Sequence, residues 1–228
     1  VLPGLVNAHM HETLTRGLCE DRPLDRWLAE ICFPLDLSYT PEIMRAAALM
    51  NQMEMIRGGT TTFLDIYRHP AACAEVCERS GLRAILAPQI MAEPADVGES
   101  VESARAFVEL WKNRHPRITP GFGPHAPYTC TPDTYQRVAD YAERFDVPIH
   151  THLSETQWEQ SIIAQRYGGT PAEYLDRIGL LTSRLSVAHG IYLSPDDIAL
   201  LKARDVSVVY NPSSNAKLAS GVAPIPEM

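Results

Sequence analysis

The chain has 228 residues, of which 45% are hydrophobic and 21% charged, and its formal net charge is −8. This length can bury one sizeable core, the acidic balance argues against a nucleic-acid-binding surface, and no apolar run approaches the roughly 20 residues that a membrane span needs. The five cysteines form no Cys-x-x-Cys pair, so we expect a reduced, cytoplasmic compartment.

Strand-like and helix-like segments alternate along the chain. The first predicted strand is followed by two helices, and the segments are, in order, 5–11, 24–32 and 41–57. Strands and helices then alternate at 60–67, 71–80, 83–90, 99–113, 118–126, 132–145 and 147–155. Two helices, a strand, a helix and a last strand follow at 156–167, 171–178, 185–193, 194–203 and 206–212. In the helix at 41–57, one stripe holds the apolar residues Ile43, Ala46, Ala47, Met50, Met53 and Ile56.

Repeated strand–helix units with short loops predict a parallel sheet. Seven strands favour an α/β fold of the TIM (β/α)₈ barrel type, with residues 1–228 as one domain. The alternative is an open doubly wound sheet, but this would require a glycine-rich turn where the chain has HMHETLTRG. Because the sequence begins within a strand and stops at GVAPIPEM, we expect a fragment of the barrel without its eighth strand.

Six of the eight histidines lie within predicted strands or at their carboxyl ends, namely His9, His11, His125, His150, His152 and His189. These strand ends form the active-site rim of a barrel, and residues two apart on a strand point the same way. Neutral imidazoles are good zinc ligands, so the pattern predicts a metal site. His69 and His115 lie outside the pattern, and we expect them to be a loop residue and a surface residue.

Five segments resemble the amidohydrolase superfamily in the same order, and they are PGLVNAHMH, GFGPHAPYTC, HTHLSE, VAHG and NPSSNAKLASGVAPIPEM. The resemblance is strongest to the branch of S-adenosylhomocysteine/methylthioadenosine deaminases and triazine hydrolases. It implies that one divalent metal, Zn²⁺ or alternatively Fe²⁺, is bound by His9, His11 and His152. It also implies that Glu155 moves protons, that His189 stands beside the reacting centre and that His125 touches the substrate.

His150 is not a ligand in this resemblance, and we expect a packing residue or a partner of the ligands. The family's remaining ligand, an aspartate at the end of strand 8, is absent from this sequence, as is the small β-sandwich usual in the family.

The adenosine-recognising members carry a glutamate after the first helix and an arginine after strand 3, where this chain has Asp36 and Pro88. Asp36 could hydrogen-bond a ribose or an amino group. Trp27 could stack on a flat heterocycle, or it could pack on an apolar helix face.

The combined pattern predicts a metal-dependent aminohydrolase, a deaminase in which zinc-activated water attacks an sp² ring carbon of a nitrogen heterocycle with loss of ammonia. Two alternatives remain open, a triazine-type hydrolase that releases chloride or an alkylamine and an inert partial barrel. We expect a small heterocyclic substrate and no nucleic-acid or membrane partner. Homodimers are usual among similar proteins of full length.

Overall fold

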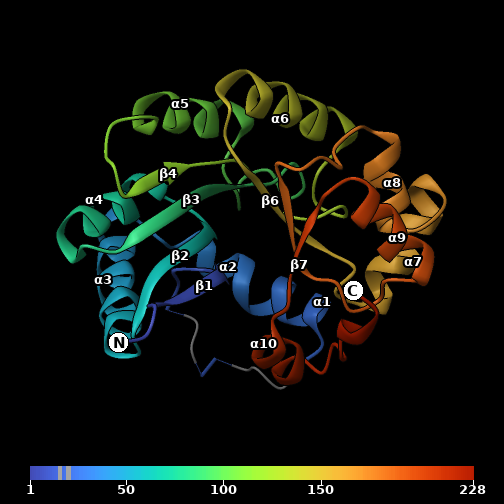
Figure 1. The fold of residues 1–228 in the computed structure, drawn as a ribbon, viewed down its shortest axis with the longest axis horizontal. Coiled ribbons are helices and arrows are strands. Elements are labelled where there is room, and N and C mark those ends of the chain that lie inside the picture. The colour runs from blue at the N-terminus through green and yellow to red at the C-terminus, as the bar shows by residue number, and fades with distance from the viewer. Residues whose placement is uncertain (15–16, 19–21) are drawn as a thin grey trace.

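In the computed structural model, which describes residues 1–14, 17–18 and 22–228, strands and helices alternate and the strands lie inside a ring of helices (Figure 1). Every pair of neighbouring strands is parallel. The strands are β1 Leu5–Met10, β2 Thr60–Tyr67, β3 Arg83–Ile90, β4 Ile118–Pro120, β5 Gly123–Pro124, β6 Ile149–Leu153, β7 Leu185–His189 and β8 Ser207–Val209.

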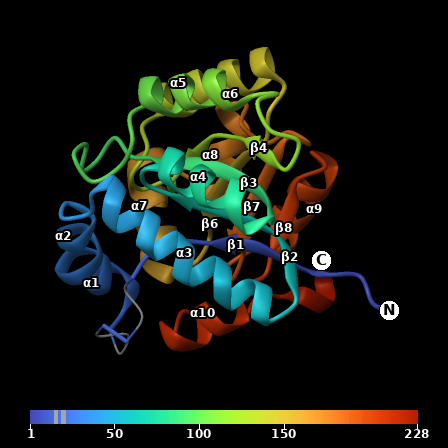
Figure 2. The same ribbon diagram turned by 90° about the vertical axis from the view of Figure 1, so that its left-hand side faces the viewer.

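The outer ring is formed by α3 to α9, as two perpendicular views show (Figures 1 and 2). The helices are α1 Leu24–Trp27, α2 Phe33–Asp36, α3 Pro41–Arg57, α4 Pro70–Ser80, α5 Val101–Trp111, α6 Pro132–Phe145, α7 Gln157–Tyr167, α8 Pro171–Arg177, α9 Pro195–Ala203 and α10 Pro212–Lys217. A π-helical turn, Leu28–Cys32, joins α1 to α2, and a 3₁₀ turn spans Ile225–Glu227. None of the helices in the described ranges is long and apolar enough to cross a bilayer.

Hydroxyl side chains fix where most of the outer helices begin. Each accepts a hydrogen bond from the backbone N–H three residues later, which satisfies one of the free donors of the first turn. In four of these helices a proline, whose fixed φ suits the first helical position, comes next. The capping residues are Thr40, Ser100, Thr131, Thr156, Thr170 and Ser194.

The strands form two sheets that meet at the fourth barrel position. One has the order β1-β2-β3-β4, with β5 also paired to β3, and the other has the order β6-β7-β8. A parallel bridge between Phe122 and Ile149 joins them. The strand predicted at 118–126 is therefore divided, and β4 and β5 together fill one position. The (β/α)-barrel prediction is confirmed, with seven strand positions filled in the described ranges.

The fourth strand is divided at the sequence GFG, where the backbone passes very close to its neighbours. A Cβ atom on Gly123 would lie 2.7 Å from the Ala87 carbonyl oxygen, and one on Gly121 would lie 2.8 Å from the Pro148 carbonyl oxygen. Only glycine allows the backbone to approach its neighbours this closely. The approach carries the chain between the two sheets and brings residue 125 to the carboxyl ends of the strands.

The largest core lies between the strands β3 to β7 and the helices α5 to α9. On α3, the apolar stripe seen in the sequence is not the face that packs against the sheet. Ala47 is fully buried, but Met50 and Met53 are more than half exposed. The face of α3 that packs inward is instead formed by Met44, Ala47, Ala48 and Gln52. Small alanines allow the helix to lie close to the sheet, whereas Met50 and Met53 point outward.

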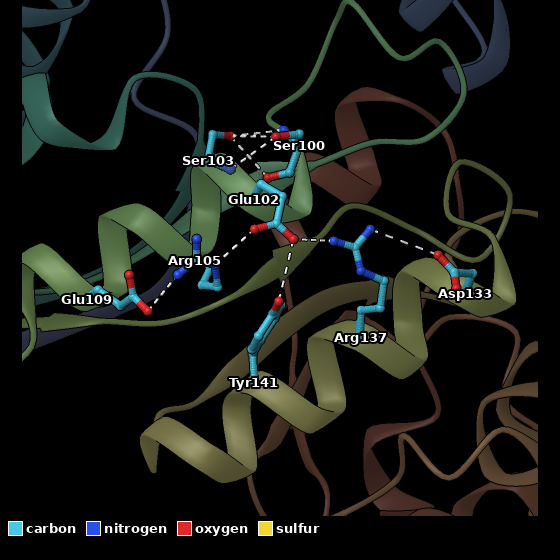
Figure 3. Close-up of polar contacts among 8 residues, drawn as sticks. All are labelled: Ser100, Glu102, Ser103, Arg105, Glu109, Asp133, Arg137 and Tyr141. Atoms are coloured by element: carbon cyan, nitrogen blue, oxygen red, sulfur yellow. Dashed lines mark hydrogen bonds and ion pairs between the residues drawn. The ribbon is translucent and has the colours of Figure 1, made fainter.

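On the surface, α5 and α6 are connected by charged and polar contacts (Figure 3). Glu102 accepts from Arg105 and Tyr141 and forms an ion pair with Arg137. Glu102 is exposed and its three partners are partly exposed, so each pair contributes little to stability. The network aligns the two helices and takes no part in the cavity described next.

Candidate metal centre and cavity

A cavity of about 540 Å³ opens at the carboxyl ends of the strands, a size typical of small-molecule sites. Its floor carries the polar residues His9, His11, His125, His152, Glu155 and His189. Its upper walls include Leu24, Trp27, Leu28, Phe33, Asp36, Tyr67, Tyr210, Asn211 and Ser213. All eight residues for which the sequence predicts a role therefore line this one cavity. Because the side chains of Leu24, Trp27, Leu28 and Phe33 give one apolar part of this wall, it suits a flat, weakly polar ligand.

His11 and His152 face one another across the floor of the cavity. Nδ1 of His11 lies 2.6 Å from the Ile66 carbonyl oxygen, and Nδ1 of His152 lies 2.6 Å from the His125 carbonyl oxygen. A carbonyl only accepts, so both Nδ1 atoms carry the proton and both Nε2 atoms are bare. The two Nε2 atoms are nevertheless 3.2 Å apart, which places one lone pair against another.

His9 is oriented by side chains instead of backbone. Its Nδ1 lies 2.8 Å from Nε2 of His150, and Nδ1 of His150 lies 2.7 Å from the Ser186 hydroxyl, which in turn donates to the Ile149 carbonyl oxygen. Because the Ser186 hydroxyl donates to the Ile149 carbonyl oxygen, it accepts from His150 Nδ1, and His150 Nε2 in turn accepts from His9 Nδ1. Nε2 of His9 is then bare as well. His150 is thus the partner of a candidate ligand.

Three bare Nε2 atoms in one place fit a divalent metal ion. His9, His11 and His152 each offer a nitrogen, all within 4.8 Å of one another. Burial lowers the pKa of all three, that of His11 to about 4, so protonation does not relieve the repulsion near neutral pH. The separation of 3.2 Å between His11 and His152 is close to the edge of about 3.3 Å expected for a tetrahedron with zinc–nitrogen bonds of about 2.05 Å.

Removing the His150 ring nitrogen that accepts from His9 should weaken metal binding. For His150→Phe we expect a loss of roughly 10- to 100-fold in zinc affinity, because partners that orient metal-binding histidines have effects of this size. His150→Gln keeps an oxygen that can accept from His9 Nδ1, and it should recover most of the affinity. Competition with a chromogenic chelator measures both. Equal affinities for the two variants would contradict the orienting role.

Glu155 lies beside this centre in the turn after β6. Glu159, at the start of α7, accepts the backbone N–H of Ser154 and of Glu155 at 2.9 Å each, and so fixes the turn. Burial raises the pKa of Glu155 to about 8. Its Oε2 lies 3.5 Å from Nε2 of His189. A carboxyl group with a pKa this near neutrality can both take and give a proton.

His189 occupies the end of β7 with a left-handed backbone, φ 76°. Its Nδ1 hydrogen-bonds Asn215 Oδ1 at 2.8 Å, and burial lowers its pKa to about 4. The imidazole is therefore neutral near pH 7. Asn215 lies on α10, 26 residues further along the chain. Its contact with His189 therefore arises only from the fold.

The buried carboxyl of Glu155 should make the metal-stripped protein less stable as the pH rises. In the unfolded chain the group ionises near 4.5, but in the folded state burial keeps the proton up to about pH 8. Between these values the folded state binds more protons, so the free energy of unfolding falls by up to about 1.4 kcal/mol per pH unit. Relative to the unsubstituted protein, Glu155→Gln should gain stability across this window and level off above it. Denaturant unfolding at several pH values measures the difference, and a pH-independent difference would contradict the assignment.

The three residues predicted to contact substrate line the cavity, and each already has one polar atom engaged by a neighbour. His125 Nδ1 is 2.9 Å from the Thr129 hydroxyl, and burial lowers the pKa of His125 to about 3. The Asp36 carboxylate accepts from the Tyr67 hydroxyl, so one of its oxygens is already engaged. Trp27 donates from Nε1 to the Leu18 carbonyl oxygen, and its ring lines the cavity.

Sequence reasoning missed several residues that hold the site in place. Glu159 and Ser186 gave no signal, because their partners are backbone groups or a histidine that only the fold identifies. Asn215 lay in the segment NPSSNAKL at the end of a predicted strand, where turn chemistry explains asparagine equally well. At the end of β3 the cavity is lined by Gln89 and not by Pro88.

The fold and this histidine centre define the class: a parallel (β/α) barrel with a metal-type site at the carboxyl ends of its strands. The chain belongs to the amidohydrolase family, whose sequence profile matches residues 1–228.

The chain is 43% identical over 230 residues to a 5-methylthioadenosine/S-adenosylhomocysteine deaminase of Halothermothrix orenii, covering 100% of this chain and 53% of the relative. An adenosine deaminase of Xanthomonas campestris with bound zinc superimposes with a TM-score of 0.93 at 37% identity, covering 99% of this chain and 53% of that one. An atrazine chlorohydrolase of Arthrobacter aurescens shares the fold, with a TM-score of 0.88 at 22% identity. The superposition covers 99% of this chain and 57% of the chlorohydrolase chain. The chain thus spans about half the length of the relatives it matches.

Proposed function

We propose that this chain carries the metal and proton-transfer centre of a deaminase that acts on an adenosine-type nucleoside, such as 5-methylthioadenosine or S-adenosylhomocysteine. The observation that supports this most directly is the convergence, in one cavity, of three bare Nε2 atoms beside the buried carboxyl group of Glu155, whose pKa burial raises to about 8. The names of the relatives at 43% and 37% identity support the choice of an adenosine-type substrate.

In this proposal His9, His11 and His152 hold one divalent ion, with Zn²⁺ favoured over Fe²⁺ because a zinc ion is bound in the adenosine deaminase relative. When bound, zinc supplies Lewis acidity and lowers the pKa of water toward neutrality. The orientation of the ligands is supplied by the chain itself, through the Ile66 and His125 carbonyl groups and through His150.

Glu155 is the proton carrier of the proposed reaction. It takes a proton from the attacking water and delivers it to a ring nitrogen of the substrate, which makes the adjacent sp² carbon more electrophilic. The same proton path, run again, protonates the departing amino group so that it leaves as ammonia. Glu159 fixes the backbone from which Glu155 reaches the ring.

Neutral His189 accepts a hydrogen bond at Nε2, because Asn215 engages its Nδ1, and so orients the water beside Glu155. His125 hydrogen-bonds the heterocycle from the opposite side of the floor. The apolar wall with Trp27 stacks on the ring and excludes bulk water, which strengthens these polar contacts.

The triazine-type reaction is the second candidate, and the shared fold supports it only at the level of architecture. An ammonia-release assay distinguishes the two. Purified protein loaded with zinc is offered 5-methylthioadenosine, S-adenosylhomocysteine and a chlorotriazine, with chelator-treated protein as the control. We expect zinc-dependent ammonia from the nucleosides. Chloride or alkylamine release without ammonia would favour the triazine reaction, and no turnover in zinc-loaded protein would favour the inert barrel.

We also propose a reducing, cytosolic compartment for the protein. Cys32, Cys73, Cys77 and Cys130 are buried and form no disulfide, which supports this placement. The fifth cysteine, Cys19, lies outside the described residues.

A further inference from the structure

A second group of metal-binding side chains lies outside the cavity, where α3 and α4 cover β1 and β2 (Figure 1). Glu12 follows β1, Asp65 is on β2 and Cys73 is on α4. Their exposed fractions are 0%, 2% and 1%, and one ligand atom from each lies within 4.8 Å of the others. Two carboxyl groups and a thiol are therefore held together out of contact with water.

The Glu12 carboxylate is short of hydrogen-bond donors. Its Oε1 accepts from Gln52 Nε2 at 3.1 Å, but its Oε2 is buried and accepts from none of the described residues. The backbone N–H of Glu12 points away, to Asp65 Oδ1 at 2.8 Å. A carboxylate oxygen that has lost its hydration without gaining a partner is unfavourable, so this position calls for a metal ion or a proton.

Gln52 cannot supply the missing donor. Its carbonyl oxygen accepts from the Ser80 hydroxyl at 2.7 Å, which fixes the direction of the amide and turns Nε2 toward the cluster. That nitrogen has two hydrogens and already faces three acceptors, namely Glu12 Oε1, Cys77 Sγ at 3.3 Å and Cys73 Sγ at 3.8 Å. The two N–H groups of Gln52 are thus shared among three acceptors, and the amide has no hydrogen left for Glu12 Oε2.

We propose that Glu12, Asp65 and Cys73 form a second, buried metal-binding site, separate from the histidine centre. Cys77 lies one helical turn beyond Cys73 on the same face of α4, where its Sγ accepts from Gln52 Nε2. Mixed oxygen and sulfur ligands suit Zn²⁺, whereas Mg²⁺ and Ca²⁺ take oxygen ligands only. On binding, the Cys73 S–H bond breaks, its proton passes to solvent and a metal–sulfur bond forms without any redox change.

Such an ion would join three elements at one point. Glu12 is the neighbour of His11 in sequence, Asp65 precedes Ile66, and Ile66 is the residue whose carbonyl orients His11. A metal held between Glu12 and Asp65 would therefore brace the backbone on both sides of His11 and tie it to α4. The role is structural, and it does not depend on which reaction the histidine centre performs.

Cobalt binding tests the proposal, because Co²⁺ bound to a thiolate has a near-ultraviolet charge-transfer absorption that Co²⁺ bound only to imidazole and carboxylate lacks. Chelator-stripped protein is titrated with CoCl₂. We expect this absorption to appear and to saturate at one equivalent beyond that taken by the histidines. Cys73→Ser should abolish it, and Cys130→Ser, at a buried cysteine that contacts the Ile90 carbonyl instead, should leave it unchanged.

Glu12→Gln gives an independent test that keeps both thiols and the shape of the side chain. We expect cobalt affinity at this site to fall at least roughly tenfold, while metal binding by the histidines persists. If the unsubstituted protein fills the histidine centre with cobalt and shows no thiolate absorption, the cluster is held by a shared proton and the proposal is wrong. Thiolate absorption that survives Cys73→Ser would equally overturn it.

Discussion

Glu155→Gln is expected to lower kcat for ammonia release by about 10²- to 10⁴-fold, the usual contribution of a positioned acid–base group. The substitution keeps the size of the side chain but cannot carry a proton between water and a ring nitrogen. Burial has already raised the pKa of this group to about 8, so the unsubstituted protein can both take and give the proton near pH 7. Steady-state kinetics and metal analysis together measure the effect.

The metal content of the Glu155→Gln variant should be unchanged, because the three imidazoles are oriented by other groups. Glu143→Gln, at an exposed position on α6, is a matched control that should retain full activity. Activity within a few-fold of normal in Glu155→Gln would exclude Glu155 as the proton carrier. A simultaneous loss of metal would mean that the carboxylate acts as a ligand instead.

The second large effect is expected for His152→Ala, which should abolish zinc binding at the histidine centre and all zinc-dependent turnover. The physical reason is that His152 and His11 supply the facing pair of Nε2 atoms, and one imidazole fewer leaves an incomplete ligand set. At zinc concentrations about 100-fold above Kd, binding adds about 2.7 kcal/mol to the free energy of unfolding, and the variant should gain none of this. Denaturant unfolding with and without zinc measures the gain.

This experiment is best done in a Cys73→Ser background, so that the buried cluster does not contribute. His115→Ala, in the loop before β4, is the control and should keep the full stabilisation by zinc. A His152→Ala variant that zinc still stabilises to the same extent would mean that His152 is not a ligand.

The barrel and the residues around its cavity could be predicted from the sequence because both follow from local periodicity. Alternating strand and helix patterns indicate a parallel sheet, and in such a sheet the strand ends, with His9, His152 and His189, must meet on one side. The order of the motifs then indicates the family. Neither step requires knowledge of which side chains touch.

The contacts that orient these residues could not be predicted, because each joins segments far apart in the chain. His9 depends on His150, which is 141 residues away, and His189 on Asn215, which is 26 residues away. The α3 stripe shows a related limit. Its apolar periodicity correctly indicates a helix, but whether Met50 or Ala47 faces the sheet depends on how closely the helix packs.

The groups that orient the imidazoles determine which positions around the metal centre can tolerate substitution. His11 and His152 are held by carbonyl groups of residues 66 and 125, and every amino acid has a carbonyl group. Position 66 can therefore exchange one apolar residue for another over many generations without disturbing the ligand beside it. His9 relies on the side chains of His150 and Ser186, so position 150 is limited to side chains that can still accept from His9 Nδ1. A library of random variants selected for zinc binding should accordingly be diverse at 66 and far more restricted at 150.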